Sequence, residues 1–523
     1  MTPNFKRPLI GLLLAAAFAG SSQAAAGRLE EAAAQAIKTN PDVLGKYHQF
    51  QASVQERNVT LGRYLPTFDV LFGTGYEHRE SPLYTNPTGE RRYNFQNTRA
   101  TLRQNFFEGF ATWNDSKRLE HASLVRFYEM LDLSETTALE AAKAYIDVYR
   151  FRQLVAFAEE NYATHRVIYE KIKERANTGV GRKVDLETAA GRLALAESNL
   201  LTETSNLHDV TARYQRIVGS LPPAEMEAPP AALLNQDFPT DRVGAINRSF
   251  EKSPALKASY ENILSAIRNV EVQKAGYYPR IDGYIEQGHD KNAGGYGDPS
   301  TAPIAGNPRS STNYTTYGLT ATWNLFRGFQ DVSKQRKASE EKNSAKDLRE
   351  KVCREVRQNS AMAFNDQLRL TEQMKYLDQH MLSTDKAREA FRRQFDIGQR
   401  TLLDVLDTEN EYYTARRNYL NGEQDLAIAK AKYQAAAGNL LNTLQLKNLE
   451  MDPPSPSTTP DEDMATSCPA DTIDVVAVDK EAIFKRAQAK EDLYRTQNAA
   501  PAAEPAKPAA KAKKAPTKVK PAQ

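Results

Sequence analysis

The chain has 523 residues, a formal net charge of +3 and 26% charged residues. Lys6 and Arg7 contribute two positive charges, and six lysines after Pro501 against Glu504 contribute five more, so the rest of the chain carries −4. A nucleic-acid-binding protein carries its basic charge on a folded face. Because this chain carries it in a tail, we expect no nucleic-acid partner.

Residues 1–24 predict a secretory signal peptide. Lys6 and Arg7 give the positive start, residues 9–19 the apolar middle, and Ser22-Gln23-Ala24 a cleavage site of small residues. The apolar stretch is shorter than the roughly 20 residues that a transmembrane helix needs, and no later segment reaches that length. We therefore expect an exported chain without a helical membrane anchor, and not an inner-membrane transporter.

The same landmarks occur twice along the chain, which predicts two internal repeats. Residues 64–69 (YLPTFD) match 277–282 (YYPRID) at an offset of 213, and 105–110 (NFFEGF) match 324–329 (NLFRGF) at an offset of 219. We expect a signal peptide at 1–24, a first repeat at 25–237 and a second at 238–450, each with a helix, a β-hairpin and a long helix pair. Residues 451–523 predict a disordered, low-complexity tail with a short helix near 480–495.

Four segments predict strands of about 10 to 14 residues, the length that crosses hydrocarbon at a tilt. Apolar and polar residues alternate along 68–77 and 317–325, and the partner runs are 93–106 and 280–290. The alternative is a pair of hairpins packed on a soluble core. If the strands lie in a membrane, several chains must pool them into one closed barrel, because unpaired strand edges cannot face lipid.

Two long helices follow the hairpins. Residues 110–177 and 330–397 contain no proline and no internal glycine, so each helix could extend over roughly 90 to 100 Å. A plain coiled-coil scaffold is the alternative, but it leaves the strands and the duplication unexplained. Apolar residues recur every seven positions: Ala141, Val148, Val155 and Tyr162 in one helix, Val356, Ala363, Leu370 and Leu377 in the other, with Val352, Met374 and Met381 between them.

These residues resemble the TolC family of outer-membrane export channels. The segments 105–110 and 324–329 are similar to the family's strand-to-helix junctions, and 397–407 (IGQRTLLDVLD) is similar to its periplasmic entrance. The resemblance covers roughly residues 27–445. It implies a mixed α and β fold and a trimer, with four strands per chain in a shared 12-strand transmembrane barrel and antiparallel coiled-coil helices that form a periplasmic tunnel.

The resemblance also implies a gate. Arg400 corresponds to the family's gate arginine and Asp185 to the aspartate that binds it, whereas Phe395 stands where a tyrosine is common, so a phenolic hydrogen bond is missing. Asp404 and Asp407 match the carboxylates that ring the pore constriction. They are three residues apart and share a helix face, so a trimer would gather six carboxylates that attract polyvalent cations.

Each gate residue also has a purely structural interpretation. Thr401-x-x-Asp404 fits a helix capping box, and Asp185 lies where helix N-termini favour acids. Arg400 alone would be a solvated surface charge, worth about 0–1 kcal/mol.

No enzyme motif, such as a phosphate-binding loop, HExxH or paired CxxC, is present, and the seven histidines are scattered. We therefore expect no catalysis, no cofactor and no structural metal. Cys353 and Cys468 are too few for a disulfide framework. One bridge is possible, and we favour two unpaired thiols.

The function that we expect is an outer-membrane duct with a periplasmic helical domain. It would export proteins by type I secretion and dock to an inner-membrane ABC exporter and a periplasmic adaptor. A multidrug efflux channel is the alternative from the same family. The missing lipidation cysteine after the signal favours secretion, because many drug-efflux relatives carry a lipid anchor. A secreted coiled-coil adaptor or scaffold is the alternative from another class.

Overall fold

The computed structural model describes residues 28–80, 90–179, 181–230, 234, 238–296, 311–446, 468–470 and 478–498. The predicted signal peptide and the lysine-rich end of the tail lie outside these ranges. The chain divides into two compact units, Met1–Asp471 and Thr472–Gln523. The second unit contains helix α12 (Lys480–Asn498), which begins where a helix was predicted and continues three residues beyond the expected end. None of the described helices is long and apolar enough to span a bilayer.

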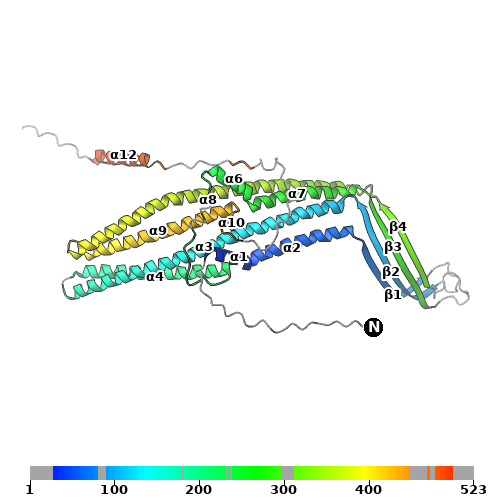
Figure 1. Cartoon of the computed structure of the whole chain (residues 1–523), viewed down its shortest axis with the longest axis horizontal. Coiled ribbons are helices and arrows are strands. Elements are labelled where there is room, and N and C mark those ends of the chain that lie inside the picture. Colours follow the sequence, from blue (N-terminus) through cyan, green and yellow to red (C-terminus); the bar gives the residue numbers. More distant parts are fainter. Residues whose placement is uncertain are drawn as a thin grey trace, which may run out of the picture. The chain divides into compact units, whose positions relative to one another are not determined.

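The elements of the first unit occur twice in the same order (Figure 1). Asn40 and Ser253 cap corresponding helices by accepting a backbone N–H, and a proline follows each of them. The division into two internal repeats stays a prediction. The first set is α1 (Leu29–Thr39), α2 (Pro41–Leu61), η1 (Gly62–Tyr64), β1 (Thr67–Glu80), β2 (Glu90–Glu108), α3 (Ala111–Asn177) and α4 (Lys183–Val218). The second is α6 (Arg242–Lys252), α7 (Pro254–Lys274), η2 (Ala275–Tyr277), β3 (Arg280–Tyr296), β4 (Ser311–Thr322), α8 (Gln330–Asp396) and α9 (Leu402–Ala436), followed by α10 (Leu440–Thr443).

The strands form one antiparallel sheet in the order β1-β2-β3-β4. Strands β2 and β3 have 19 and 17 residues and exceed the predicted runs, because their backbones stay paired as far as Arg92 and Tyr296, beyond the apolar pattern. Strand β4 begins at Ser311 and ends at Thr322, so the prediction that Trp323 and Leu325 lie in the strand was wrong. Backbone pairing sets these limits, and side-chain alternation does not report them.

Large apolar side chains on the sheet are exposed within a single chain. Phe68, Val70 and Phe72 of β1 are 67%, 63% and 69% exposed, and Tyr317 and Leu319 of β4 are 80% and 75% exposed. An uncovered apolar surface of this kind needs another apolar phase or another protein surface against it.

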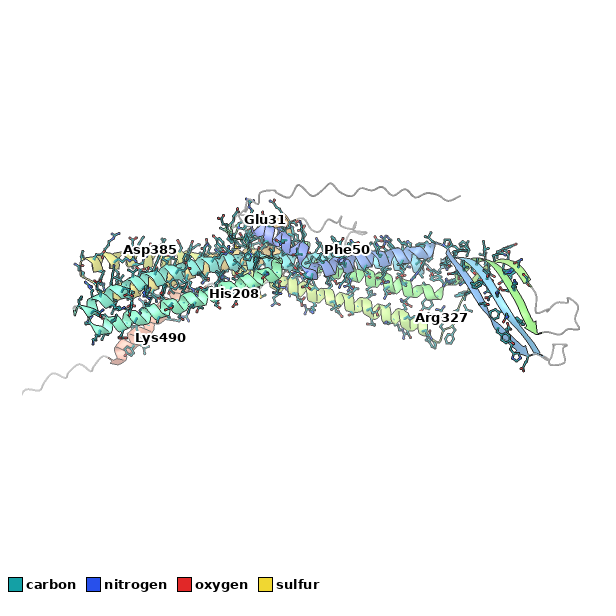
Figure 2. The ribbon with its side chains drawn as sticks, turned by 90° about the horizontal axis from the view of Figure 1, so that it is seen from below. Glu31, Phe50, His208, Arg327, Asp385 and Lys490 are labelled. Atoms are coloured by element: carbon teal, nitrogen blue, oxygen red, sulfur yellow. A yellow bond between two sulfur atoms is a disulfide. The ribbon has the colours of Figure 1, made fainter. Side chains whose placement is uncertain are left out.

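Helices α3 and α8 each have 67 residues, which confirms the two long helices predicted from the sequence. Their predicted seam is buried: Ala141, Val148 and Ala363 are 0% exposed, and Val356 and Leu370 are 8% exposed. Helix α3 pairs with α4, and α8 pairs with α9. Both long helices begin beside the sheet, close to Arg327, and Asp385 marks the far part of α8 (Figure 2).

Helices α7 and α9 fill the space between α3 and α8 one after the other. Near the sheet α7 contacts both long helices, and farther away α9 takes that place. The main core lies beside this change-over, where α1, α3, α4 and α10 bury Leu29, Ile37, Tyr145, Val210 and Leu440. The helix pairs beyond it, away from the sheet, end at the predicted gate.

The structure joins Cys353 of α8 to Cys468 in a disulfide, so the favoured prediction of two unpaired thiols was wrong. Their Cα atoms are 5.9 Å apart although 115 residues separate them in sequence, and the spacing of two cysteines cannot reveal such proximity. Arg357 also donates a hydrogen bond to the carbonyl oxygen of Pro469, over 3.1 Å. The segment 468–470 is therefore anchored to α8.

Candidate gate and the helix ladder

The two helix pairs end in matching tight turns. Gly179 and Gly398 have φ values of 78° and 76°, a left-handed conformation that glycine adopts without strain. The amide of Gly398 donates to the carbonyl oxygen of Phe395, and that of Gln399 to Gln394, over 2.9 and 2.8 Å. These bonds satisfy carbonyl groups at the end of α8 and turn the chain toward α9.

Asp404 occupies a capping box at the start of α9, as the structural interpretation predicted. Its amide donates to Thr401 Oγ1 over 3.2 Å, and its carboxylate accepts the amide of Thr401 over 3.0 Å. These hydrogen bonds lower the pKa of the Asp404 carboxyl, with a smaller contribution from Arg400. Asp404 therefore stays ionised at neutral pH, as the proposed pore ring requires. Its place in such a ring remains a prediction.

Asp407 already has a cationic partner within the chain. Its carboxylate pairs with Arg192 of α4, and both side chains are partly exposed. Sequence reasoning missed Arg192, although this residue lies seven positions after Asp185 and so faces the same side of α4. The Arg192–Asp407 pair joins α4 to α9 close to the turn at Gly398.

The described part of the chain does not bring Arg400 and Asp185 together. Asp185 accepts from Arg182 Nε over 3.3 Å. Arg400 Nε donates to Gln394 over 3.2 Å, and its guanidinium lies 4.5 Å from the centroid of the Phe391 ring. An Arg400–Asp185 pair within one chain is therefore not formed, and a pair between neighbouring copies stays a prediction.

Phe395 has a packing role where a tyrosine was expected from the resemblance. It packs against the buried cluster of Ile168, Ile172, Ala189, Val405 and Leu406. This cluster takes residues from α3, α4 and α9, so it fastens the ends of the two helix pairs together. A phenyl ring suits such a contact, because it leaves no hydroxyl group in need of a partner.

Four ion pairs link α9 to helices α3 and α4, and we call them the α9 ladder. They are Arg192–Asp407, Arg416–Glu160 at 2.6 Å, Arg417–Glu203 at 2.6 Å and Arg150–Asp425 at 2.8 Å. Glu203 of α4 is only 1% exposed. Since all four pairs have one member on α9, moving α9 away from α3 and α4 breaks each of them.

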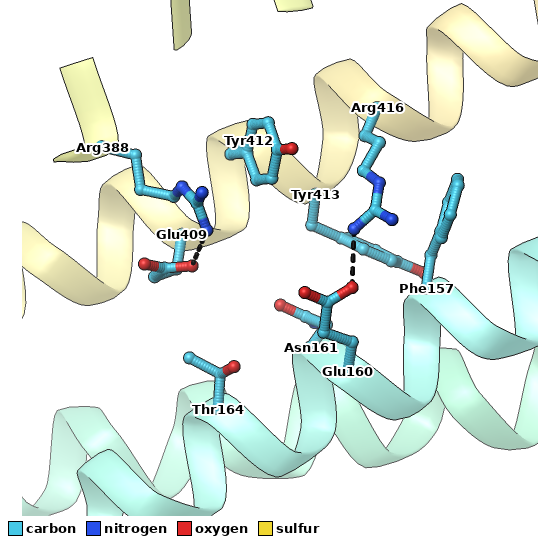
Figure 3. A pocket seen from close by; sticks show the side chains of 9 residues that line it. All are labelled: Phe157, Glu160, Asn161, Thr164, Arg388, Glu409, Tyr412, Tyr413 and Arg416. Atoms are coloured by element: carbon cyan, nitrogen blue, oxygen red, sulfur yellow. Dashed lines mark hydrogen bonds and ion pairs between the residues drawn. The ribbon is translucent and has the colours of Figure 1, made fainter. Parts of the chain in front are cut away.

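A second layer of contacts supports the ladder beside Arg416 (Figure 3). The Arg416 guanidinium lies 3.8 Å from the centroid of the Phe157 ring. On the neighbouring turn, Arg388 of α8 lies 4.2 Å from the Tyr412 ring and 3.6 Å from Glu409. Glu409, which is 6% exposed, is also bound by Arg392 at 2.8 Å. Helices α8 and α9 are thus held together as one unit that the ladder fastens to α3 and α4.

Comparisons with known proteins agree with this architecture. Residues 245–439 match the family model described as outer membrane efflux protein. The chain is 22% identical to the outer membrane efflux protein BepC of Brucella suis (65% of this chain, 71% of the relative) and 23% identical to the outer membrane protein TolC of Escherichia coli (88% and 92%). It is 21% identical to the proteases secretion protein PrtF of Dickeya chrysanthemi (79% and 88%). The solved CmeC outer membrane channel of Campylobacter jejuni shares the fold, with a TM-score of 0.67, 14% identity and coverage of 79% and 86%.

Proposed function

The chain belongs to the TolC family of outer membrane efflux proteins, and we propose that three copies of it form one closed duct for protein export. Members of this family are channels rather than enzymes, and they lie in the outer membrane. The chain is therefore an outer-membrane efflux channel. The trimer, its partners and the exported substrate are the parts of the proposal that go further.

The observation that carries the proposal is the open four-stranded sheet with exposed apolar side chains. Strands β1 and β4 each have one neighbour within the described sheet, so the other edge of each offers unpaired N–H and C=O groups. In hydrocarbon each such group costs several kcal/mol. Pairing β4 of one copy with β1 of the next removes these edges, and three copies would close a barrel of 12 strands.

The side chains of β1 fit this arrangement. Phe68, Val70 and Phe72 stand on one face and would meet lipid, whereas Asp69 and Gly73 stand on the other and would face the channel. Outer-membrane lipid is thus the proposed surroundings of the sheet. The helices would extend the channel into the periplasm.

The oligomer is tested by purifying the protein with and without detergent and weighing it by native mass spectrometry. We expect extraction only with detergent and a particle of three chains. A water-soluble monomer would overturn the proposal and favour the secreted adaptor or scaffold.

For the gate we propose that Arg400 of one copy binds Asp185 of the next and that Asp404 and Asp407 line the constriction, with Phe395 packing the tip. The exposure of Arg400 supports this, since its guanidinium lies at the surface of the chain, where its contacts are with Gln394 and Phe391 of α8 in the same chain. Single-channel conductance of the closed state should rise in Arg400→Ser and stay unchanged in the control Arg393→Ser, whose side chain is 80% exposed and bound to Glu389. Equal closed-state conductance in Arg400→Ser and the wild type would refute the gate.

The carboxylate ring is tested by current block with a trivalent cation. Asp404→Asn keeps an oxygen acceptor for the cap but removes three charges from the trimer, so block should weaken. Asp407→Asn should weaken it less, because Arg192 already offsets that charge. Unaltered block in both variants would exclude the ring.

We propose type I secretion, with an inner-membrane ABC exporter and a periplasmic adaptor as partners. The name of PrtF, a proteases secretion protein, supports this branch, whereas the name of BepC, an outer membrane efflux protein, favours efflux. Deleting the gene separates the two, with the wild-type gene restored as control. Loss of specific proteins from the culture medium at unchanged drug resistance supports secretion. Drug sensitivity with unchanged secreted proteins would replace it with efflux.

A further inference from the structure

A cavity of about 450 Å³ lies where α9 ends and α7 begins, between α3 and α8. Its cause is the small size of the residues at this joint: α9 ends with Ala435 and Ala436, and α7 starts with Pro254 and Ala255. The two helix ends meet closely, because a Cβ on Gly438 would lie 2.6 Å from Pro254 Cδ. Small side chains beside such a contact leave space that neither helix fills.

The lining of the cavity combines apolar side chains with carboxylates. Leu139 of α3 and Val352 and Val356 of α8 are apolar, while Asp132 of α3 and Glu355 of α8 are acidic. The two carboxylate residues are exposed, so the cavity is open to solvent. Its volume lies in the range of sites that hold small organic molecules.

The charge of the lining is negative. Lys432 is the lysine of the lining, and it already binds Asp366 over 3.3 Å. The Asp132 side chain is exposed on one side only, and its loss of water on the other side, followed by the nearby Glu129, raises the pKa of its carboxyl. Glu355 has a contact of 3.7 Å with Lys351, one helical turn away, between side chains that are 56% and 68% exposed. Such an exposed pair neutralises little.

The cavity lies beside the contact of helix α6 with α8 and α9. Helix α6 packs there against Ala363, Phe364 and Tyr433, and Ala436 of the cavity lining packs against the same cluster. Lys432 and Ala435 lie about 100° and 160° around α9 from Tyr433, since successive residues turn by about 100°. Lys432 and Ala435 of the lining therefore face away from Tyr433 and its contact with α6.

We propose that this cavity binds an organic cation with an apolar body, such as a hydrophobic amine, guanidinium or phosphonium ion. The apolar lining residues contact the apolar body of the ligand, and Asp132 of α3 and Glu355 of α8 attract its positive charge. An anion of the same shape meets two carboxylates and is rejected. The site lies in the wall of the helical part, away from the gate residues, and binding there does not depend on which substrate the duct exports.

The test measures equilibrium binding of tetraphenylphosphonium and tetraphenylborate to the purified full-length protein in lipid nanodiscs, with empty nanodiscs as baseline. The two ions have the same shape and opposite charge, and neither titrates. We expect saturable binding of the phosphonium alone, and a loss of at least tenfold in affinity in Asp132→Asn/Glu355→Gln. The matched control Glu340→Gln/Asp347→Asn removes the same charge from exposed positions on α8 and should bind like the wild type.

A second variant tests the cavity independently of charge. Ala435→Leu fills space at the end of α9, and we expect it to abolish phosphonium binding while far-UV circular dichroism and the oligomer mass stay unchanged. Equal phosphonium affinity in the wild type and in the Asp132/Glu355 variant, equal binding of both ions, or an equal loss in the control would overturn the proposal. A negative result here does not contradict the proposed channel function, because trimer formation and conductance are measured separately.

Discussion

The ladder pair between Glu203 and Arg417 is the contact whose removal we expect to loosen α9 most. The Glu203 side chain is 2% exposed, and Arg417, which binds it over 2.6 Å, is 41% exposed. Arg417→Met keeps the length and the apolar stem of the side chain but leaves the buried carboxylate without its cation. Asn206 Nδ2 still donates to Glu203 over 3.3 Å.

The magnitude follows from the burial of the two partners. Removing one member of a fully buried pair costs about 3–5 kcal/mol. Because Arg417 is partly solvated and Asn206 remains, we expect about 2 kcal/mol. At about 1.4 kcal/mol per tenfold, this corresponds to roughly 30-fold more frequent opening of α9 from α4.

Hydrogen–deuterium exchange of the amides in α9 measures this opening directly, because local exchange reports local opening free energies. Peptides from residues 402–436 should exchange roughly 30-fold faster in Arg417→Met, by the conversion above. Peptides from the sheet should not change. The control Arg393→Met removes an exposed pair with Glu389 and should alter exchange by less than about fivefold, within the range for surface pairs.

The double variant Arg417→Met/Glu203→Leu decides whether the reasoning is correct. Removing the stranded charge as well should return most of the lost protection, since replacing a buried pair with apolar residues is often neutral. If Arg417→Met exchanges like the control, or if the double variant exchanges as fast as the single one, the buried charge is not what holds α9.

Three further predictions concern stability. Burial raises the pKa of Glu135 to about 8, against the hydrogen bonds it accepts from Leu441 and Leu440. The folded pKa of Glu135 lies above its unfolded value, so its contribution to the free energy of unfolding is complete below about pH 4.5 and is lost as the pH rises through 8. This loss amounts to at most about 5 kcal/mol. In denaturant melts at pH 5 and 8, Glu135→Gln should therefore show a smaller difference in stability than the wild type. Burial lowers the pKa of His165. The contribution of this residue to the free energy of unfolding is therefore present above about pH 6.5 and is lost as the pH falls below that value. Denaturant melts between pH 5 and 7 should depend less on pH in His165→Gln than in the wild type. In Cys353→Ser, the disulfide-linked peptide with Cys468 should be absent from a non-reducing digest. Opening this loop of 115 residues should lower the free energy of unfolding by up to about 5 kcal/mol in denaturant melts. Identical melts of the wild type with and without reductant would contradict this.

The long helices could be predicted from the sequence, because their determinants are local. An uninterrupted run without proline or glycine and a seven-residue apolar repeat define both the length of α3 and the buried seam at Ala141 and Val148. The capping box at Thr401 and Asp404 is local as well, since its two partners are three residues apart. Strand ends such as Tyr296 were not predictable, because they depend on the partner strand.

The ladder could not be predicted, because its partners are far apart in sequence and charges are common. Arg416 and Glu160 are separated by 256 residues, and Arg150 and Asp425 by 275. With 69 basic and 66 acidic residues in the chain, no pattern singles these out. The cavity at the α7–α9 joint is equally hidden, since runs such as Ala435-Ala436-Ala437 predict only helix. Contacts between helices so far apart in sequence appear only once the helices are packed together.

The free energy needed to break the ladder is part of what a docking partner must supply to open the proposed gate. Arg192–Asp407, Arg416–Glu160 and Arg150–Asp425 each have one side chain that is more than half exposed, so each contributes about 0–1 kcal/mol. With about 2 kcal/mol for the buried Glu203 pair, derived above from the cost of stranding a charge, breaking the ladder itself costs at most about 5 kcal/mol per chain, and separating the apolar cluster around Leu406 adds to this. A partner shifts such an equilibrium only by its difference in affinity for the two states, so it must bind the open helix pairs about 10³- to 10⁴-fold more tightly than the closed ones. An interface of micromolar affinity for the open state corresponds to about 8 kcal/mol, which suffices for this difference only if the partner binds the closed state with millimolar or weaker affinity. The ladder is therefore strong enough to keep α9 in place at rest and weak enough for docking to release it.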